Sequence, residues 1–287
     1  MMRILIGYNG SEASIGALED LHQAGLPEHT EALLITVAES WQPPKTRAEA
    51  RAIVDRGANI LSEGFPGWNV ATEVREGSPP REILARARTF KPDLIVVAEP
   101  VEENRLFLGY TTQTVLNDAE CSVRIARGRP ANRYRPERLL AAFNGSPASI
   151  VAVDTISSRS WRPKAEVLVL AVADANSLGT LGRSMPTAVL EAEFVHEWTE
   201  RLPLGVLRTL STVGISSSLQ TRVGNPKEAI LTEAEEWDAD CIFVGPHCSL
   251  NSYERFLLGS VSASVAARAQ CSVEVVRLTE RSVISKN

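Results

Sequence analysis

The chain of 287 residues repeats itself, and this duplication limits its possible folds more than any other feature of the sequence. Five segments of the first half return in the same order in the second half, with Asn9 corresponding to Asn144 at an offset of 135 residues. The offset reaches 150 residues at Gly109 and Gly259, so the second copy has gained residues between its matched segments. Such a repeat predicts two similar structural units in tandem. The matched pairs are 3–18 with 138–153, 32–39 with 167–174, 73–84 with 220–231, 106–115 with 256–265 and 121–127 with 271–277.

Each copy alternates short apolar runs with segments that carry apolar residues at helical spacing. The apolar runs are nearly continuous, as in LIVVA at 94–98, which is typical of parallel strands buried on both faces. The pattern predicts an α/β protein built from two tandem, doubly wound, five-stranded parallel-sheet domains. In the first copy we expect strands at 3–8, 31–38, 70–76, 93–98 and 122–126, and helices at 12–25, 45–63, 79–90 and 110–119.

Domain boundaries follow from the offsets of the repeat and from one polar stretch between the copies. We expect the first domain over residues 1–128 and the second over 137–287. The linker at 129–136 contains two prolines and three arginines, a composition typical of an exposed connection.

Composition excludes several classes of function. A net charge of −5, with no cluster of Lys and Arg, argues against nucleic-acid binding. No apolar run approaches the roughly 18 residues that a membrane span needs, so we expect no membrane segment. The N-terminus lacks the long apolar region of a secretory signal. Four cysteines without a CxxC pair favour free thiols in a reducing cytoplasm, with Cys121 and Cys271 buried.

A ligand site is expected at one edge of each sheet. In doubly wound sheets ligands bind outside the carboxyl ends of the strands, where the strand order reverses. The stretch Cys241–Val265 combines an apolar strand, a glycine turn and a helix that begins with Gly259 and Ser260. The free N–H groups and the dipole at a helix start favour an anion such as a phosphate.

At these residues the sequence resembles the universal stress protein family. The resemblance rests on AAFNGSPAS, VGNPKEAI, CIFVGPH, FLLGSVSASV and CSVEVVR, in this order and spacing, and it covers nearly the whole chain. It implies a five-stranded α/β unit of the adenine-nucleotide alpha-hydrolase-like fold, often dimeric, and here present twice. One subgroup of the family binds ATP through glycine, two residues, glycine, nine residues, then glycine with serine or threonine. Its first strand usually ends in an aspartate that helps to hold the nucleoside.

The second copy keeps this pattern in part. Gly245 takes the first glycine position, but Cys248 stands where the second glycine is expected. Ten residues, not nine, then precede Gly259 and Ser260. Asn144 replaces the aspartate, although a carboxamide still offers hydrogen bonds to a ribose or a base.

The first copy departs further, with Ala98 in place of the first glycine and Tyr110 in place of the serine. Its loop carries Glu99, Glu102 and Glu103, which would repel phosphates. The resemblance therefore points to the second copy as the site of ATP or AMP, with Mg²⁺ bound alongside the nucleotide. The predicted binding residues are Asn144, Gly145, Ser146, Val172, Val223, Gly224, Gly245, His247, Gly259, Ser260, Val261 and Ser262.

Three functions stay open from the sequence. The first is a nucleotide-binding regulator of a stress response that acts on protein partners. The second is a scaffold of the same fold without a nucleotide, which the departures at Asn144 and Cys248 favour. The third is a weak ATPase, for which we find no catalytic residue, and the histidines lack the spacing of a metal site. As in the dimers of the family, the two domains are expected to pair through their last strands, CSVRIAR and CSVEVVR, and a homodimer of the whole chain is a further option.

Overall fold

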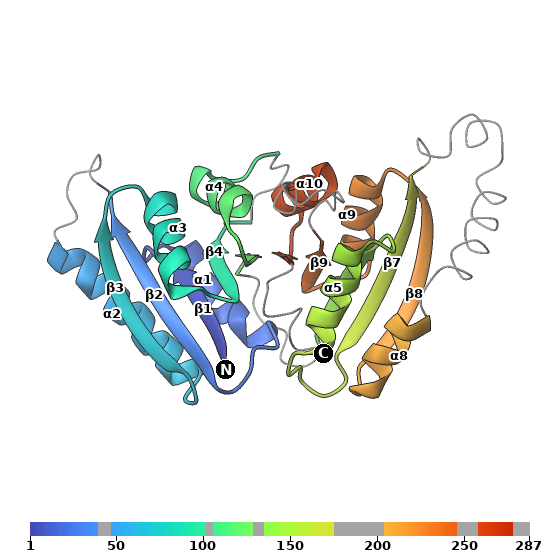
Figure 1. The fold of residues 1–287 in the computed structure, drawn as a ribbon, viewed down its shortest axis with the longest axis horizontal. Coiled ribbons are helices and arrows are strands. Elements are labelled where there is room, and N and C mark those ends of the chain that lie inside the picture. Colours follow the sequence, from blue (N-terminus) through green and yellow to red (C-terminus); the bar gives the residue numbers. More distant parts are fainter. Residues whose placement is uncertain (40–46, 102–105, 129–134, 175–203, 246–257, 278–287) are drawn as a thin grey trace.

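The fold is known from a computed structural model of the chain, shown in Figure 1. The structure describes residues 1–39, 47–101, 106–128, 135–174, 204–245 and 258–277. His247 of the predicted site, Cys248 and most of the predicted linker lie outside these ranges.

The described residues of the first half form five strands and four α-helices, close to the predicted bounds. The strands are β1 (Met2–Gly7), β2 (Thr30–Ala38), β3 (Asn69–Glu76), β4 (Leu94–Ala98) and β5 (Ser122–Ala126). The helices are α1 (Glu12–Asp20), α2 (Arg47–Gly64), α3 (Pro79–Phe90) and α4 (Tyr110–Asp118). The predicted helix 12–25 is too long, because α1 gives way to a 3₁₀ turn at Leu21–Gln23 and Gly25 then turns the chain with a φ of +60°.

The second half repeats this order in the described ranges. Its strands are β6 (Arg138–Phe143), β7 (Glu166–Asp174), β8 (Ser216–Gly224), β9 (Cys241–Val244) and β10 (Ser272–Val275). Its described helices are α5 (Pro147–Ser157), α8 (Leu204–Thr212), α9 (Pro226–Glu236) and α10 (Ser260–Arg268). Prolines open α3, α5 and α9, where the missing N–H costs no helical hydrogen bond.

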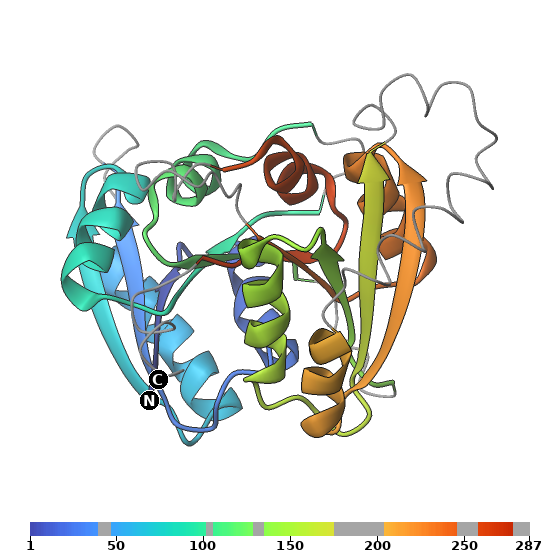
Figure 2. The ribbon, with the colours of Figure 1, turned by 45° about the vertical axis from the view of Figure 1, so that its right-hand side comes forward.

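All ten strands belong to one sheet, in the order β3-β2-β1-β4-β5-β10-β9-β6-β7-β8. Neighbouring strands within each half are parallel, and their order reverses between β1 and β4 and between β6 and β9. The two halves meet at β5 and β10, which run antiparallel. The predicted α/β fold with doubly wound sheets is confirmed, and Figures 1 and 2 show the halves side by side with α4 and α10 adjacent at the middle.

The core has a shared layer and two separate ones. Because side chains alternate along a strand, β1 sends Leu5 to one face and Ile4 and Ile6 to the other. Leu5 joins a cluster that runs through both halves, from α3 and α4 across the sheet centre to α9 and α10. Ile4 and Ile6 pack under α1 and α2, and the second half has its own cluster under α5 and α8. In the part of the chain that the structure describes, no helix has the length and apolar character to cross a membrane.

A second contact between the halves lies at the turn after α1. The carbonyl of Gly25 accepts a hydrogen bond from the N–H of Ser160 at 2.9 Å, and the ring of Trp161 covers the turn. A Cβ at position 25 would lie 2.7 Å from this ring, so only glycine fits both the left-handed backbone and the close approach.

We predict that Gly25→Ala destabilises the chain more than Gly214→Ala. Both glycines have positive φ, so each substitution costs roughly 1–2 kcal/mol of backbone energy. Position 214 has no atom within 4 Å, whereas position 25 adds the overlap with Trp161, worth roughly 1–3 kcal/mol. Urea unfolding of the two variants measures the difference, and equal losses would contradict the packing argument.

Candidate functional site

The turn after β6 holds three of the predicted binding residues. The carboxamide oxygen of Asn144 accepts a hydrogen bond from the N–H of Ser146 at 3.1 Å, across Gly145 with its φ of +74°. Ser146 in turn caps α5, because its hydroxyl oxygen accepts from the N–H of Ser149 at 3.3 Å. The oxygen of Asn144 thus supports its own turn, and the carboxamide nitrogen is the donor this side chain offers to a ligand.

The start of α10 lies against the end of β9. The hydroxyl of Ser262 is buried and donates to the carbonyl of Gly245 at 2.6 Å, which ties the helix to the strand. Gly259 precedes the helix and has no side chain to satisfy the first N–H groups. A Cβ on Gly245 would lie 2.7 Å from Ala148, so this glycine is required by the packing of α5 whether or not a ligand binds.

The remaining predicted residues are spread along the same edge of the sheet. Val172, on β7, is half-buried and packs against the shared core, so the contacts that the structure shows for it are structural. Val223 and Gly224 end β8, which is separated from β6 by β7 and so lies roughly 10 Å away. The structure therefore gathers 144–146, 245 and 259–262 where the strand order reverses, and leaves 223–224 at the periphery.

The first half contains a pocket of about 530 Å³ at the corresponding edge. Its lining includes Asn9, Ser11 and Thr112, which correspond to Asn144, Ser146 and Ser262. The sequence analysis predicts a site in the second half and does not predict this pocket. The offsets of the repeat would have allowed that prediction, because they relate the predicted binding residues of the second half to residues that line the pocket of the first.

Glu99 lies in the chain between two residues that line this pocket, Ala98 and Pro100, and its own carboxylate contacts the start of α4. Its carboxylate is buried, with 2% of the residue exposed, and accepts a hydrogen bond from the N–H of Gly109 at 3.1 Å. Gly109 begins α4, so a carboxylate of the protein itself holds the position that an anionic ligand would take. Glu12 and Glu39 line the pocket, whose described lining contains no Lys or Arg. The repulsion of phosphates by this loop stays a prediction, and two of its three glutamates, Glu102 and Glu103, lie outside the described residues.

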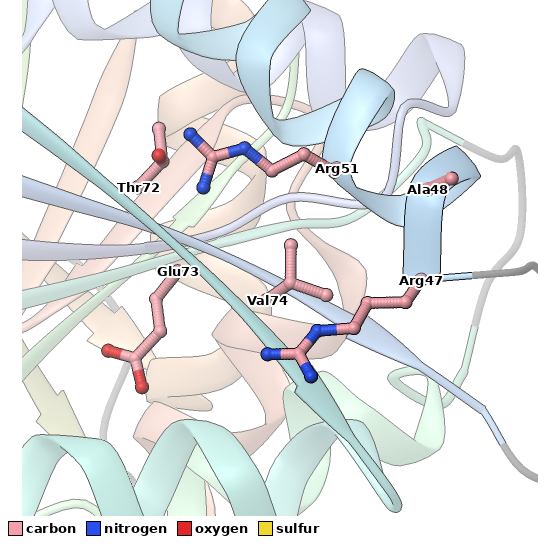
Figure 3. Close-up of a pocket in the computed structure, with 6 residues that line it drawn as sticks. All are labelled: Arg47, Ala48, Arg51, Thr72, Glu73 and Val74. Carbon is pink, nitrogen blue, oxygen red and sulfur yellow. The ribbon is translucent and has the colours of Figure 1, made fainter.

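A second opening, of about 550 Å³, lies between α2 and the outer strand β3. Figure 3 shows Arg47 and Arg51 projecting from α2 toward β3, which carries Glu73. The charges here have partners on the surface, since Arg51 pairs with Asp55 at 3.0 Å and Glu73 with Arg86 at 2.7 Å. This opening lies beside the middle of β3, at Thr72–Val74, and it shares no lining residue with the candidate site.

The described cysteines are core residues. Cys121, Cys241 and Cys271 are all buried, as predicted for Cys121 and Cys271. Burial raises the pKa of Cys121 to about 12, so its thiol is protonated at neutral pH. Among the described residues, no group of three or more His, Cys, Asp or Glu is placed to hold a metal ion.

We predict that Glu99→Ala weakens the start of α4. Loss of the carboxylate removes a hydrogen bond and a favourable charge at a helix N-terminus, which together are worth about 1–2 kcal/mol of unfolding free energy. Chemical denaturation measures the loss, and Glu76→Ala, which removes an exposed glutamate at the end of β3, is the matched control. A similar small effect of both substitutions would show that Glu99 does not cap the helix.

Comparison with known proteins places the chain by both sequence and structure. The sequence profile described as the universal stress protein family matches residues 1–127 and again 136–277. A putative universal stress protein of Staphylococcus aureus is 30% identical over 150 residues, covering 50% of this chain and 86% of that protein.

Two solved structures resemble nearly the whole chain. A universal stress protein from Archaeoglobus fulgidus superposes with a TM-score of 0.67 at 20% identity, covering 96% of this chain and 98% of that one. A functionally unknown protein from Pseudomonas aeruginosa gives 0.66 at 17% identity, covering 100% and 98%. These two likenesses concern the fold alone, while the profile accounts for both copies of the repeat, and the chain therefore belongs to the universal stress protein family.

Proposed function

We propose that the second half binds an adenine nucleotide, ATP or AMP, and that the chain regulates a stress response through this binding. The observation that carries the proposal is the contrast between two equivalent helix starts. In the first half, Glu99 supplies a carboxylate to the N–H of Gly109. In the second half, the residue that corresponds to Glu99 is Pro246, and no acidic residue stands in the first turn of α10. Among the described residues, a carboxylate therefore occupies the start of α4 and none occupies the start of α10, where we expect an anionic ligand to bind.

The described residues of the second half fit a nucleotide in their chemistry. The first turn of α10 offers backbone N–H groups and the Ser260 side chain to phosphate oxygens. Asn144 offers a carboxamide nitrogen at the end of β6, where a ribose or base would lie. Mg²⁺ would be carried by the phosphates and water, as is usual for this ion.

Binding is expected to act on protein partners rather than to drive a reaction. A nucleotide that contacts both α10 and the turn after β6 would change the surface at this edge of the sheet, and ligands shift conformations by such differential contacts. The scaffold without a nucleotide and the weak ATPase remain the alternatives, and the same experiments separate them.

The test is thermal unfolding of the purified chain with ATP or AMP, each with Mg²⁺. A ligand at 100 times its dissociation constant stabilises the folded state by about 2.7 kcal/mol, which gives a measurable rise in Tm. We expect this rise for the unmodified chain. No rise with either nucleotide supports the scaffold, and phosphate released from ATP above a protein-free blank supports the ATPase.

A pair of matched variants locates the site. Gly259→Asp places a carboxylate at the start of α10, in the way that Glu99 does for α4, and we expect it to abolish the rise in Tm. Gly109→Asp makes the same change at the start of α4 and should leave the rise intact. Both glycines have extended backbone at a helix N-cap, where aspartate is well tolerated. Loss of the response in Gly109→Asp alone would move the site to the first half.

A further inference from the structure

The pocket of the first half has apolar walls formed by four side chains from three elements. Ile35 and Val37 come from β2, Ile83 from α3 and Val97 from β4. Ile35, Ile83 and Val97 belong to the shared core cluster and Val37 packs against it, so the interior of the sheet holds these walls in place. A ligand that reaches them gains from the burial of apolar surface, and the volume of about 530 Å³ is in the range of small-molecule sites.

Two carboxylates line the same pocket. Glu12 lies in the first turn of α1, which follows β1, and Glu39 directly follows β2. Because β1 and β2 are parallel neighbours, both glutamates come from the same edge of the sheet. Among the described residues neither carboxylate has a hydrogen-bond or ion-pair partner, and the described lining contains no Lys or Arg. The described lining is therefore negatively charged, without a cationic side chain to balance it.

Four of the other polar side chains of the lining are engaged within the protein. The carboxamide oxygen of Asn9 accepts a hydrogen bond from the N–H of Ser11 at 3.0 Å, and the hydroxyl oxygen of Ser11 accepts from the N–H of Ser14 at 3.2 Å. The hydroxyl of Ser14 donates to the carbonyl of Ser11 at 2.9 Å, and that of Thr112 donates to a carbonyl at the end of β4 at 3.5 Å. These bonds support the turn after β1 and the start of α4. The two carboxylates are the charged groups of the described lining that remain for a ligand.

Both copies of the repeat have the apolar walls, but they differ in charge. At the offsets of the duplication, each wall residue corresponds to an aliphatic residue of the second half: Leu170, Val172, Ile230 and Val244. Glu39 also has an acidic counterpart, Asp174, whereas Glu12 corresponds to Pro147. The first copy therefore combines the same kind of walls with one carboxylate more than the second.

An organic cation suits this lining better than a phosphate or a metal ion. A phosphate would meet two carboxylates and no cationic side chain of the described lining, which is repulsive. A divalent metal ion takes about six oxygen ligands, and the described residues contain no group of three or more His, Cys, Asp or Glu placed to hold one. A protonated amine forms strong hydrogen bonds with one or two carboxylates, and an apolar body on the same molecule matches the walls.

We propose that this pocket binds a small organic cation, a protonated amine attached to an apolar body. The ammonium group lies at Glu12 and Glu39, and the apolar body lies against the walls. The two halves then select ligands of opposite charge with the same fold. Binding of the amine in the first half does not depend on a nucleotide in the second.

Three probes with one apolar body and different charges test this assignment. Tryptamine, tryptophol and indolepropionate share the indole ring and carry a positive, a neutral and a negative group at neutral pH. Isothermal titration calorimetry of the full chain should give the lowest Kd for tryptamine, a higher Kd for tryptophol and no measurable binding of indolepropionate. Equal affinity for the three probes, tighter binding of the neutral or negative one, or no binding of tryptamine would overturn the proposal.

A double variant assigns the selectivity to the two carboxylates. Glu12→Gln with Glu39→Gln removes both charges and keeps the size of the side chains. We expect the Kd of tryptamine to rise about tenfold, as for the loss of two partly exposed ion pairs, while that of tryptophol stays unchanged. Glu19→Gln removes an exposed carboxylate from the same helix, outside the lining, and as the matched control it should change neither Kd. An equal rise in this control, or no rise in the double variant, contradicts the assignment.

Two further measurements place the amine in the first half. Asp174→Asn changes the second-half residue that corresponds to Glu39, and it should leave the Kd of tryptamine unchanged. An excess of ATP with Mg²⁺ should also leave this Kd unchanged, whether or not ATP binds to the second half. Weaker binding of tryptamine in either measurement would place it in the second half or in a nucleotide site, and would overturn the proposal.

Discussion

The antiparallel pairing of β5 with β10 is the contact on which the rest of the molecule depends. It joins two five-stranded sheets into one and places the helices α4 and α10 next to each other. Each half then sends an arginine to the other. Arg127 donates to the carbonyl of Ala266 in the last turn of α10, and Arg277 donates to that of Leu116 in the last turn of α4. A cation at this end of a helix is stabilised by the helix dipole.

These arginines connect the junction to both candidate sites. The last turns of α4 and α10 are held by the opposite half, while their first turns face the pocket of the first half and the predicted nucleotide site of the second. Burial lowers the pKa of Arg277, and its guanidinium group donates to the carbonyls of Leu116 and Cys121 at the end of α4 and just beyond it. Each of the two helices therefore begins at a candidate site and ends at a contact with the opposite half.

The sequence was sufficient for the fold, and insufficient for the contacts that distinguish the two copies. Apolar runs such as 94–98 set the strands, and the repeat fixed their number and order. Glu99 was recognised as a charge in a loop, but its place at Gly109 depends on how the loop returns to the helix. The opposition of Arg124 and Glu274 depends on strand direction and register, and neither can be derived from composition or spacing.

Two pairs of equivalent positions in the repeat show how the two copies differ in charge while the fold stays the same. At the helix start, the first copy has supplied its own anion through Glu99, and the second has proline at the corresponding position 246. At the junction, the first copy carries Arg124 where the second carries Glu274. Both differences are single changes of charge at buried or capping positions, where electrostatic consequences are largest because water does not screen them. Substitutions on the exposed surface, where water screens charge, would have smaller electrostatic consequences than these two.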